Sequence, residues 1–396
     1  MQARRSQQVL RPDPPRDESL PWHIRVLLTS ERSKSRAHPR EFRPWILLLY
    51  TGTGVVHYTY GPQKGIWSGE ITLLRPRYSA DYRCLFYAFL LFPGVALAHY
   101  VWPSLIGWLL PVSLYLGYCA GIFSHNHNHC PTFSDRRANE FFAAWLSIFY
   151  GYPLFAWIPT HNLNHHKHVN RAGDATITWR YTKAHNLFVA ATYFFVSAYH
   201  QSGPIREYVA KARAKGGRVY RQIVTQATTV IVAHAAMLVL GIVWLGVGQG
   251  LLAYLFGFAI PAAFALWSMM FTNYIQHVHC DPWSPHNHSR NFVSKVDNWF
   301  VFQAGYHTVH HEHPGTHWSK YPELHAKRAQ HIAPALNEHS IFVFCLKNYV
   351  LGVFSERFRT HQVGRAAYDS DPSSLATDEI FAVEAGVNAE MIQDRA

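Results

Sequence analysis

Long apolar segments alternate along the chain with polar blocks that are rich in histidine. The longest segment, Cys84–Phe123, is apolar apart from His99 and a few hydroxyl groups. Because one helix needs about 20 apolar residues to cross the hydrocarbon core of a bilayer, this segment predicts two spans that form a hairpin with its turn near Trp102. Ile223–Val247 and Leu251–Phe271 predict a second hairpin, which turns at residues 248–250.

Several weaker apolar stretches are expected to lie in the membrane interface or against the polar part of the protein. They are too short to span, or are interrupted by glycine, proline or polar residues: Trp45–Val56, Phe141–Ile158, Leu187–Tyr199 and Ile341–Phe354. Only helices and closed barrels satisfy the backbone within lipid, and the long apolar runs exclude a barrel. The pattern therefore predicts an all-α membrane protein with four transmembrane helices in two hairpins and a helical cytoplasmic cap.

The same pattern divides the chain into three parts. Residues 1–80 are predicted to be a basic arm with an interfacial segment, residues 81–355 the membrane domain, and residues 356–396 an acidic tail. Two hairpins place the arm and both polar blocks on the same side of the membrane. Since basic segments stay on the cytoplasmic side, we expect the polar blocks to lie there.

Composition supports a membrane protein rather than a nucleic-acid-binding one. Hydrophobic residues make up 49% of the chain, charged residues only 15%, and the formal net charge is +12. Such a charge first suggests nucleic acid, but the lysines and arginines flank the apolar segments, as the positive-inside rule expects. The predicted partner is therefore membrane lipid and not nucleic acid. The five cysteines form no C-x-x-C pair, so neither a disulfide framework nor a thiolate zinc site is indicated.

Histidine is the most unusual residue in the composition, with 27 copies. Four clusters in the polar blocks begin at His125, His161, Asn273 and His307. In a helix, residues four apart share one face, whereas a directly following residue is turned by about 100° and can reach a second metal. Three pairs can therefore each point at one place: His125 with His129, His161 with His165, and His307 with His311.

The number of histidines indicates two metals rather than one. Imidazole binds zinc, copper, iron and nickel, but a zinc hydrolase uses only about three protein ligands. At least nine histidines can converge here, which suits two metals with four or five nitrogens each. We therefore expect a di-metal site with redox-active iron in the cytoplasmic cap. A non-catalytic membrane protein that binds or transports metal is the alternative from another class.

Three clusters resemble the histidine boxes of the membrane fatty acid desaturase and hydroxylase superfamily, a group of integral-membrane di-iron enzymes. The boxes H-x(3-4)-H, H-x(2-3)-H-H and H-x-x-H-H are matched by residues 125–129, 161–166 and 307–311. Asn273-x3-His277 is similar to an element of acyl-CoA desaturases that supplies one more ligand. The resemblance covers about residues 80–340 and implies nine metal ligands: His125, His129, His161, His165, His166, His277, His307, His310 and His311.

The resemblance also implies two iron ions, O2 as co-substrate and a fatty acyl lipid as substrate. It suggests that Asn273 holds a metal through water. We expect Asp174 and Asp297 to orient the histidine ligands, since such partners are common around metal sites. The sequence has no dinucleotide motif and no cysteine set for an iron–sulfur cluster. A separate electron donor of the ferredoxin, rubredoxin or cytochrome b5 type, with its reductase, is therefore implied.

The motifs leave the reaction itself open. The first box has the short H-x3-H form instead of the H-x4-H of acyl-CoA desaturases. Asn273–His277 is also similar to an element of alkane monooxygenases, with Gln276 in place of Glu. Formation of a double bond in a fatty acyl chain is the first expectation. Hydroxylation, ketolation or decarboxylation of a fatty acid or alkyl chain by the same di-iron site is the alternative.

Overall fold

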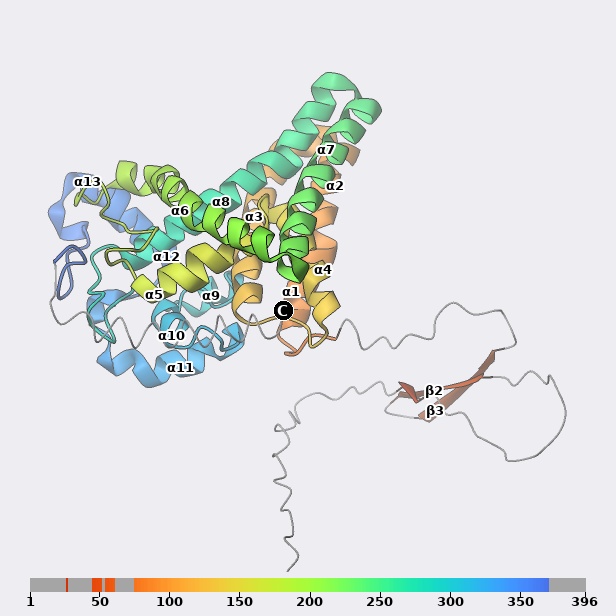
Figure 1. Ribbon diagram of the computed structural model, residues 1–396, viewed down its shortest axis with the longest axis horizontal. Helices are drawn as coiled ribbons and strands as arrows, with labels where there is room; N and C mark the ends of the chain where they lie inside the picture. The colour runs from red at the N-terminus through yellow and green to blue at the C-terminus, as the bar shows by residue number, and fades with distance from the viewer. Residues whose placement is uncertain (1–25, 28–44, 52–53, 61–74, 370–396) are drawn as a thin grey trace, which may run out of the picture. The chain divides into compact units, whose positions relative to one another are not determined.

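The computed structural model describes residues 26–27, 45–51, 54–60 and 75–369, and it divides the chain into two compact units between Glu70 and Ile71 (Figure 1). In the first unit, three antiparallel strands form a sheet in the order β1-β2-β3: β1 (Val26–Leu27), β2 (Trp45–Thr51) and β3 (Gly54–Tyr60).

The prediction of an all-α chain is wrong for this first unit. Trp45–Val56, expected to lie in the membrane interface, is divided between β2 and β3, which pair from Trp45 with Tyr60 to Thr51 with Gly54. The segment and its continuation to Tyr60 are rich in β-branched and aromatic residues, which favour a pleated strand over a helix.

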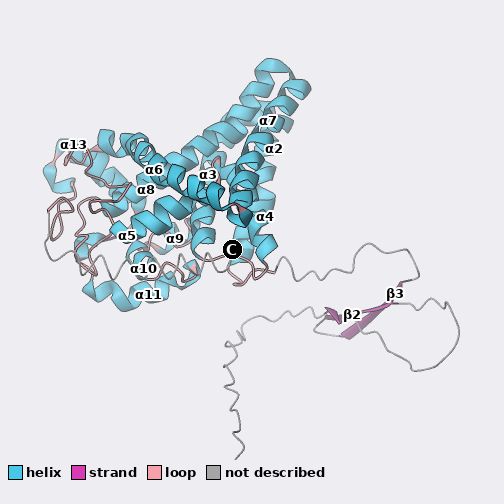
Figure 2. Ribbon diagram, in the orientation of Figure 1, coloured by secondary structure: helices cyan, strands magenta, loops and turns pink. Residues whose placement is uncertain are grey.

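The described part of the second unit is mostly helical (Figure 2). A two-stranded parallel sheet, β4 (Asn291–Phe292) with β5 (Asn337–Glu338), joins two of its loops. The α-helices are α1 (Asp81–Phe86), α2 (Phe92–Val101), α3 (Ile106–His129), α4 (Arg136–Tyr150), α5 (His166–His168), α6 (Leu187–Lys215), α7 (Gly217–Tyr254), α8 (Ile260–His277), α9 (Lys295–Phe300), α10 (His307–Glu312), α11 (Tyr321–Arg328), α12 (Ile341–Cys345) and α13 (Gly352–Phe354).

The first predicted hairpin is present. Asp81–Val101 and Pro103–His129 are both long and apolar enough to cross a membrane, and the chain turns at Trp102 between them. The helix α3 does not end at Phe123, where the apolar run stops, but continues to His129. The first histidine box therefore lies on the last turns of a helix that is long and apolar enough to span.

The second hairpin turns at Gly246 rather than at residues 248–250. Gly246 interrupts α7 with non-helical backbone angles (φ 78°, ψ 167°), which a residue with a side chain rarely adopts. Beyond it the chain folds back so closely that a Cβ atom on Gly250 would overlap the backbone of Gly241. Within the described residues, three helical segments are long and apolar enough to span when Gly217–His277 is taken as one segment, and α4 with Leu154–His168 adds a fourth if that bent pair is one span. The four-span topology remains a prediction.

A sharp bend carries the second histidine box under the spans. Asp135 caps the start of α4 by accepting from the backbone of Ala138, and Gly151 ends it with φ 74°. The following segment, Leu154–His168, is bent by 96° from α4. Only glycine fits this corner, because a Cβ atom on Gly151 would overlap the side chain of Ala262 on α8.

The main hydrophobic core packs against the third histidine box and includes one of its residues. It joins side chains of α3 and α4, such as Phe123 and Phe142, to Phe302 and to Val309 of α10. Phe302 packs edge-on against Phe123, with ring centroids 4.5 Å apart. Burial of these large side chains fixes α10 against the end of α3, so that the first and third boxes face each other.

Candidate metal centre

Four structural elements converge below the spans and bring all nine predicted ligands together. The end of α3 carries the first box, a π-helix at Ile158–His165 followed by α5 carries the second, α8 ends at His277, and α10 carries the third box. Seven of the nine histidines are buried, and His125 and His129 are partly buried. They form two adjacent sets, which we call the first and the second histidine group.

The first histidine group contains His125, His129, His161, His166 and His310. The Nε2 atom of His125 lies 3.0 Å from that of His161 and 3.1 Å from that of His310. His166 places its Nε2 atom 3.1 Å from those of His161 and His310. His129 completes the set: its ligand nitrogen and those of His125, His161 and His310 all lie within 4.8 Å of one another.

The second histidine group contains His165, His277, His307 and His311, and His277 lies at its centre. The Nε2 atom of His277 is 2.9 Å from that of His307, 3.0 Å from that of His165 and 3.2 Å from that of His311. All four side chains are buried, and their ligand nitrogens lie within 4.8 Å of one another. Each group can therefore hold one metal ion.

The second box folds differently from the expected α-helix. His161 and His165 do not share a site: His161 belongs to the first group and His165 to the second. The reason is the π-helix at Ile158–His165, in which residues five apart, not four, are joined by the backbone hydrogen bonds. This wider turn brings His166, five residues after His161, to the same metal position.

Neighbouring histidines separate as their spacing predicts. His165 and His166 belong to different groups, and so do His310 and His311. Residues adjacent in a helix are turned by about 100°, so one short helix can serve two metal positions. The two groups adjoin at His166 of the first and His311 of the second, whose ring centroids are 4.4 Å apart.

The hydrogen-bond partners of two Nδ1 atoms in the second group leave the Nε2 atoms available to a cation. Nδ1 of His165 lies 2.8 Å from a carboxylate oxygen of Asp174, and Nδ1 of His277 lies 3.2 Å from the carbonyl oxygen of His288. A carboxylate and a carbonyl oxygen can only accept, so each Nδ1 is the donor and each Nε2 is the nitrogen left for a metal. The two Nε2 atoms face each other at 3.0 Å, and a cation placed beside both could bind them together.

Asp174 is fully buried and fixes His165. Burial raises the pKa of its carboxyl group, but the interaction with His165 and the hydrogen bonds from Thr176 outweigh this effect and lower the pKa to about 2. The backbone of Asn170 and the hydroxyl of Thr176 donate to the carboxylate at 2.7 and 2.6 Å. Asp174 is therefore an ionised hydrogen-bond partner of His165 that lies outside the two histidine groups. Such partners orient metal ligands, and this role of Asp174 stays a prediction.

The first group is supported by neutral partners. Nδ1 of His125 donates to the amide oxygen of Asn126 at 3.1 Å, and Nδ1 of His310 lies 3.0 Å from the hydroxyl of Tyr321 on α11. Tyr321 is buried, and sequence reasoning missed it because no motif marks a tyrosine ten residues beyond the third box. The carbonyl oxygen of His288 was missed for the same reason, since a backbone acceptor has no sequence signal.

The structure bears differently on the predictions for Asn273 and Asp297. The side chain of Asn273 donates to the hydroxyl of Tyr193 at 3.1 Å and faces the cavity described below. The role of Asn273 in holding a metal through water remains a prediction. Asp297 accepts from the Ser340 hydroxyl at 2.6 Å and from the backbone of Ile341, and so ties α9 to α12. The expectation that Asp297 orients a histidine ligand is therefore wrong.

Burial keeps the third box neutral. Desolvation, together with the neighbouring histidines, lowers the pKa of His307, His310 and His311 well below 6.5. A metal ligand must offer an unprotonated nitrogen. At neutral pH these rings are therefore ready to bind a metal without first losing a proton.

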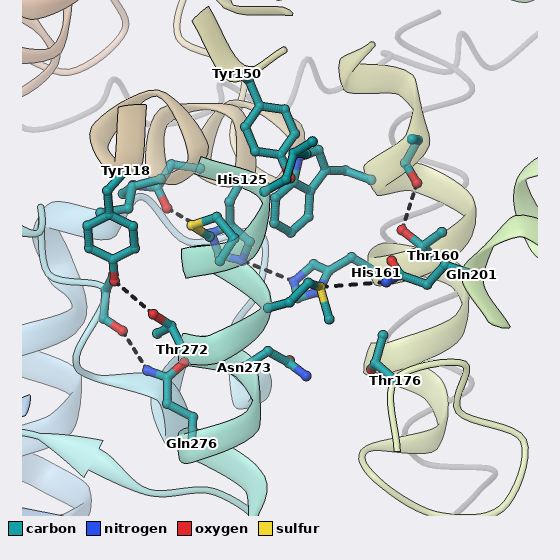
Figure 3. A pocket seen from close by; sticks show the side chains of 18 of the residues that line it. Tyr118, His125, Tyr150, Thr160, His161, Thr176, Gln201, Thr272, Asn273 and Gln276 are labelled. Carbon is teal, nitrogen blue, oxygen red and sulfur yellow. Dashed lines mark hydrogen bonds between the residues drawn. The ribbon is translucent and has the colours of Figure 1, made fainter. Parts of the chain in front are cut away.

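A mainly apolar cavity of about 210 Å³ reaches both groups. Figure 3 shows this cavity with His125 and His161 of the first group in its wall. Both groups contribute to its wall, with His125, His161 and His310 from the first and His307 from the second. None of the described residues that line it is Asp, Glu, Lys or Arg. Its remaining wall is largely aromatic and aliphatic, comes from α3, α4, α6, α8 and the second-box segment among others, and includes Ile122, Tyr150, Trp157, Phe194, Leu266 and Met269.

Comparison with known proteins agrees with this arrangement. Residues 105–343 match the family model of fatty acid desaturases, and this range includes all nine histidines of the two groups. Comparisons with curated proteins and with solved structures found no match. Since the matched range covers more than half of the chain, the protein belongs to the fatty acid desaturase family.

Proposed function

We propose that the protein is a membrane-bound, O2-dependent di-iron oxidoreductase that introduces a double bond into a fatty acyl chain. The observation that carries this proposal is the convergence of nine histidines on two adjacent positions, with the Nε2 atoms of His165 and His277 facing each other at 3.0 Å. Iron bound there would supply the activation of O2 and the removal of hydrogen from an unactivated C–H bond.

The nine-histidine donor set favours iron over zinc. Structural zinc sites are four-coordinate and catalytic ones usually use three protein ligands. Five imidazoles in one group and four in the other exceed that need, and imidazole is also a good ligand for iron. Asn273 faces the same cavity and is proposed to hold one of the ions through water.

The uncharged cavity supports an alkyl chain as the part of the substrate that is oxidised. An apolar wall excludes water and holds the chain beside the histidines, so that the position of the target carbons is set by the wall and not by a charged group. The protein thus contributes to the reaction by positioning the alkyl chain of the substrate. Which carbons lie beside the two groups decides between a double bond and the alternative products.

The remaining features of the proposal concern place and partners. The histidine groups lie at the ends of the spans that are opposite to the hairpin turns, and the basic segments support a cytoplasmic position for them. The protein is proposed to be a multi-pass membrane protein that receives electrons from a separate ferredoxin, rubredoxin or cytochrome b5, itself reduced by a reductase.

Lipid analysis of a host that expresses the chain tests the reaction. We expect new double bonds in the fatty acyl fraction, with about two irons per purified chain, and neither in a His277→Ala variant. New hydroxyl or keto groups, or shortened alkenes, would assign the alternative reactions of the same centre. A chain that binds no iron and leaves every lipid unchanged would refute the proposed function and favour a metal-binding role.

A further inference from the structure

A second, larger cavity reaches the first histidine group from another side. The apolar cavity described above, which we call the substrate cavity, is separate from it. The second cavity has a volume of about 560 Å³ and lies where the N-terminal parts of α4 and α7 meet the end of α3. We call it the arginine cavity, because Arg77, Arg136 and Arg218 line it. It shares no lining residue with the substrate cavity, so one substrate molecule does not fill both.

The wall of the arginine cavity includes a ligand of the first histidine group. His129 lines the cavity, and its ring is in contact with those of His166 and His310, at centroid distances of 4.8 and 4.7 Å. The neighbouring segment Leu154–Ile158 separates this cavity from the substrate cavity. A molecule that binds here can therefore contact His129, a member of the first group, without entering the substrate cavity.

The arginine cavity is positively charged. Among the described residues that line it, Glu140 is the only acidic one; it pairs with Arg218, at 2.6 Å from Nε, and lies 3.8 Å from Arg136. Nη1 of Arg218 is buried without a hydrogen-bond partner. Arg77 and Arg136 are exposed, and Arg136 shares Glu140 with Arg218, so three arginines against one glutamate leave an excess of positive charge at the rim for an external anion.

We propose that the arginine cavity is the docking site of the electron donor, an acidic redox protein whose carboxylates contact Arg77 and Arg136 and whose electrons enter through His129. This inference rests on the proposed function. Each docking would deliver one electron to iron held by the two histidine groups. Two such electrons, two protons and the two hydrogens removed from the lipid would together reduce one O2 to two waters. Complementary charge at a rim speeds association and makes it dependent on salt.

The test measures binding of three purified donors, a plant-type ferredoxin, a rubredoxin and a cytochrome b5, to the iron-loaded protein in lipid nanodiscs. The variant is Arg77→Glu/Arg136→Glu, in which both exposed arginines change and Arg218 keeps its partner. The control is Arg357→Glu, another exposed arginine, which follows α13. We expect at least a tenfold weaker binding of the preferred donor at low salt for the double variant, a flatter salt dependence, and a change below twofold for the control.

Dithionite reduces the iron without a docked donor, so it tests whether a variant has damaged the metal centre. Its rate of reduction should be the same in the parent, the double variant and the Arg357→Glu control. The proposal is overturned if the double variant binds the donor like the parent, if Arg357→Glu weakens binding equally, or if the parent binds none of the three. Loss of coenzyme A binding in the double variant, with donor binding intact, would assign the cavity to a substrate head group instead. A donor that binds through the arginines to a chain without lipid-oxidising activity would refute only the proposed function.

Discussion

At the scale of single residues, the position of one proton decides what a histidine can bind. Asp174 holds the Nδ1 proton of His165 and so directs its Nε2 lone pair towards His277. Tyr321 and Asn126 play the corresponding part in the first group, but without a charge. Because an anionic partner makes an imidazole a stronger ligand, the two groups are expected to differ in their affinity for metal.

Replacing Asp174 by asparagine should weaken one of the two metal positions. The amide keeps the size of the side chain but removes the charge behind His165, and loss of such a partner typically costs 10–100-fold in affinity. Titration with Fe(II) against a competing chelator should show one weakened and one unchanged equivalent. Asp135→Asn is the matched control, because asparagine also caps a helix well; equal weakening of both equivalents in Asp174→Asn would contradict the assignment.

Replacing His310 by alanine should remove the first metal position. His310 is buried, and its Nε2 atom lies 3.1 Å from those of both His125 and His166, so its loss opens the middle of the group. We expect turnover to fall by more than about 100-fold, beyond the cost of losing an outer partner, and the iron content to drop towards one per chain. His313→Ala, an exposed neighbour, should keep both; retained turnover in His310→Ala would exclude His310 as a ligand.

At the scale of elements, irregular backbone places the ligands more than regular helix does. The π-helix at Ile158–His165 separates His161 from His165, and π-turns of this kind occur often at functional sites. In the second hairpin, Gly246 reverses the chain and the close contact of Gly241 with Gly250 holds the two arms together. That contact sets the course of α8 and therefore the position of His277 at its end.

Gly250→Ala should destabilise the protein, whereas Gly248→Ala should not. A methyl group on Gly250 would overlap the backbone of Gly241, while one on Gly248 meets nothing within 4 Å. Overpacking of this kind costs about 1–3 kcal/mol, but alanine at an open helical position is slightly favourable. Thermal unfolding in detergent, followed by tryptophan fluorescence, should show a lower midpoint for Gly250→Ala alone; equal midpoints would mean that the two arms do not touch.

At the scale of the whole molecule, convergence of the four elements removes the histidines from water. Desolvation lowers the pKa of the third-box histidines well below that of an exposed histidine. No single helix would produce this effect, because each box by itself would be open to solvent. Burial thus prepares the centre for metal and also makes it sensitive to acid.

The metal-free protein should lose stability as the pH falls from 7 to 5. A histidine whose pKa is lowered in the folded state stays neutral when the protein is folded but takes up a proton when it is unfolded. Protons therefore favour the unfolded state below pH 6.5, and the free energy of unfolding falls there with decreasing pH. Each such group contributes about 1.4 kcal/mol per pH unit. The unfolding midpoint should be flat from pH 7 to 8 and fall below pH 6.5, with release of iron from the loaded form. A midpoint that does not change between pH 7 and 5 would show that these rings are not desolvated.

The sequence determined the parts of this protein that depend on local order. The length of the apolar runs predicted the first hairpin, because a bilayer has a definite thickness, and the histidine spacings predicted the nine histidines that converge and the alternation between His310 and His311. Only the tertiary structure decided the rest: the partition of His161 and His165, the support from Tyr321, the use of Asp297 between α9 and α12, and the arginine cavity. These features arise where elements distant in the chain meet, and such contacts depend on backbone irregularities and packing that leave no periodic trace in the order of residues.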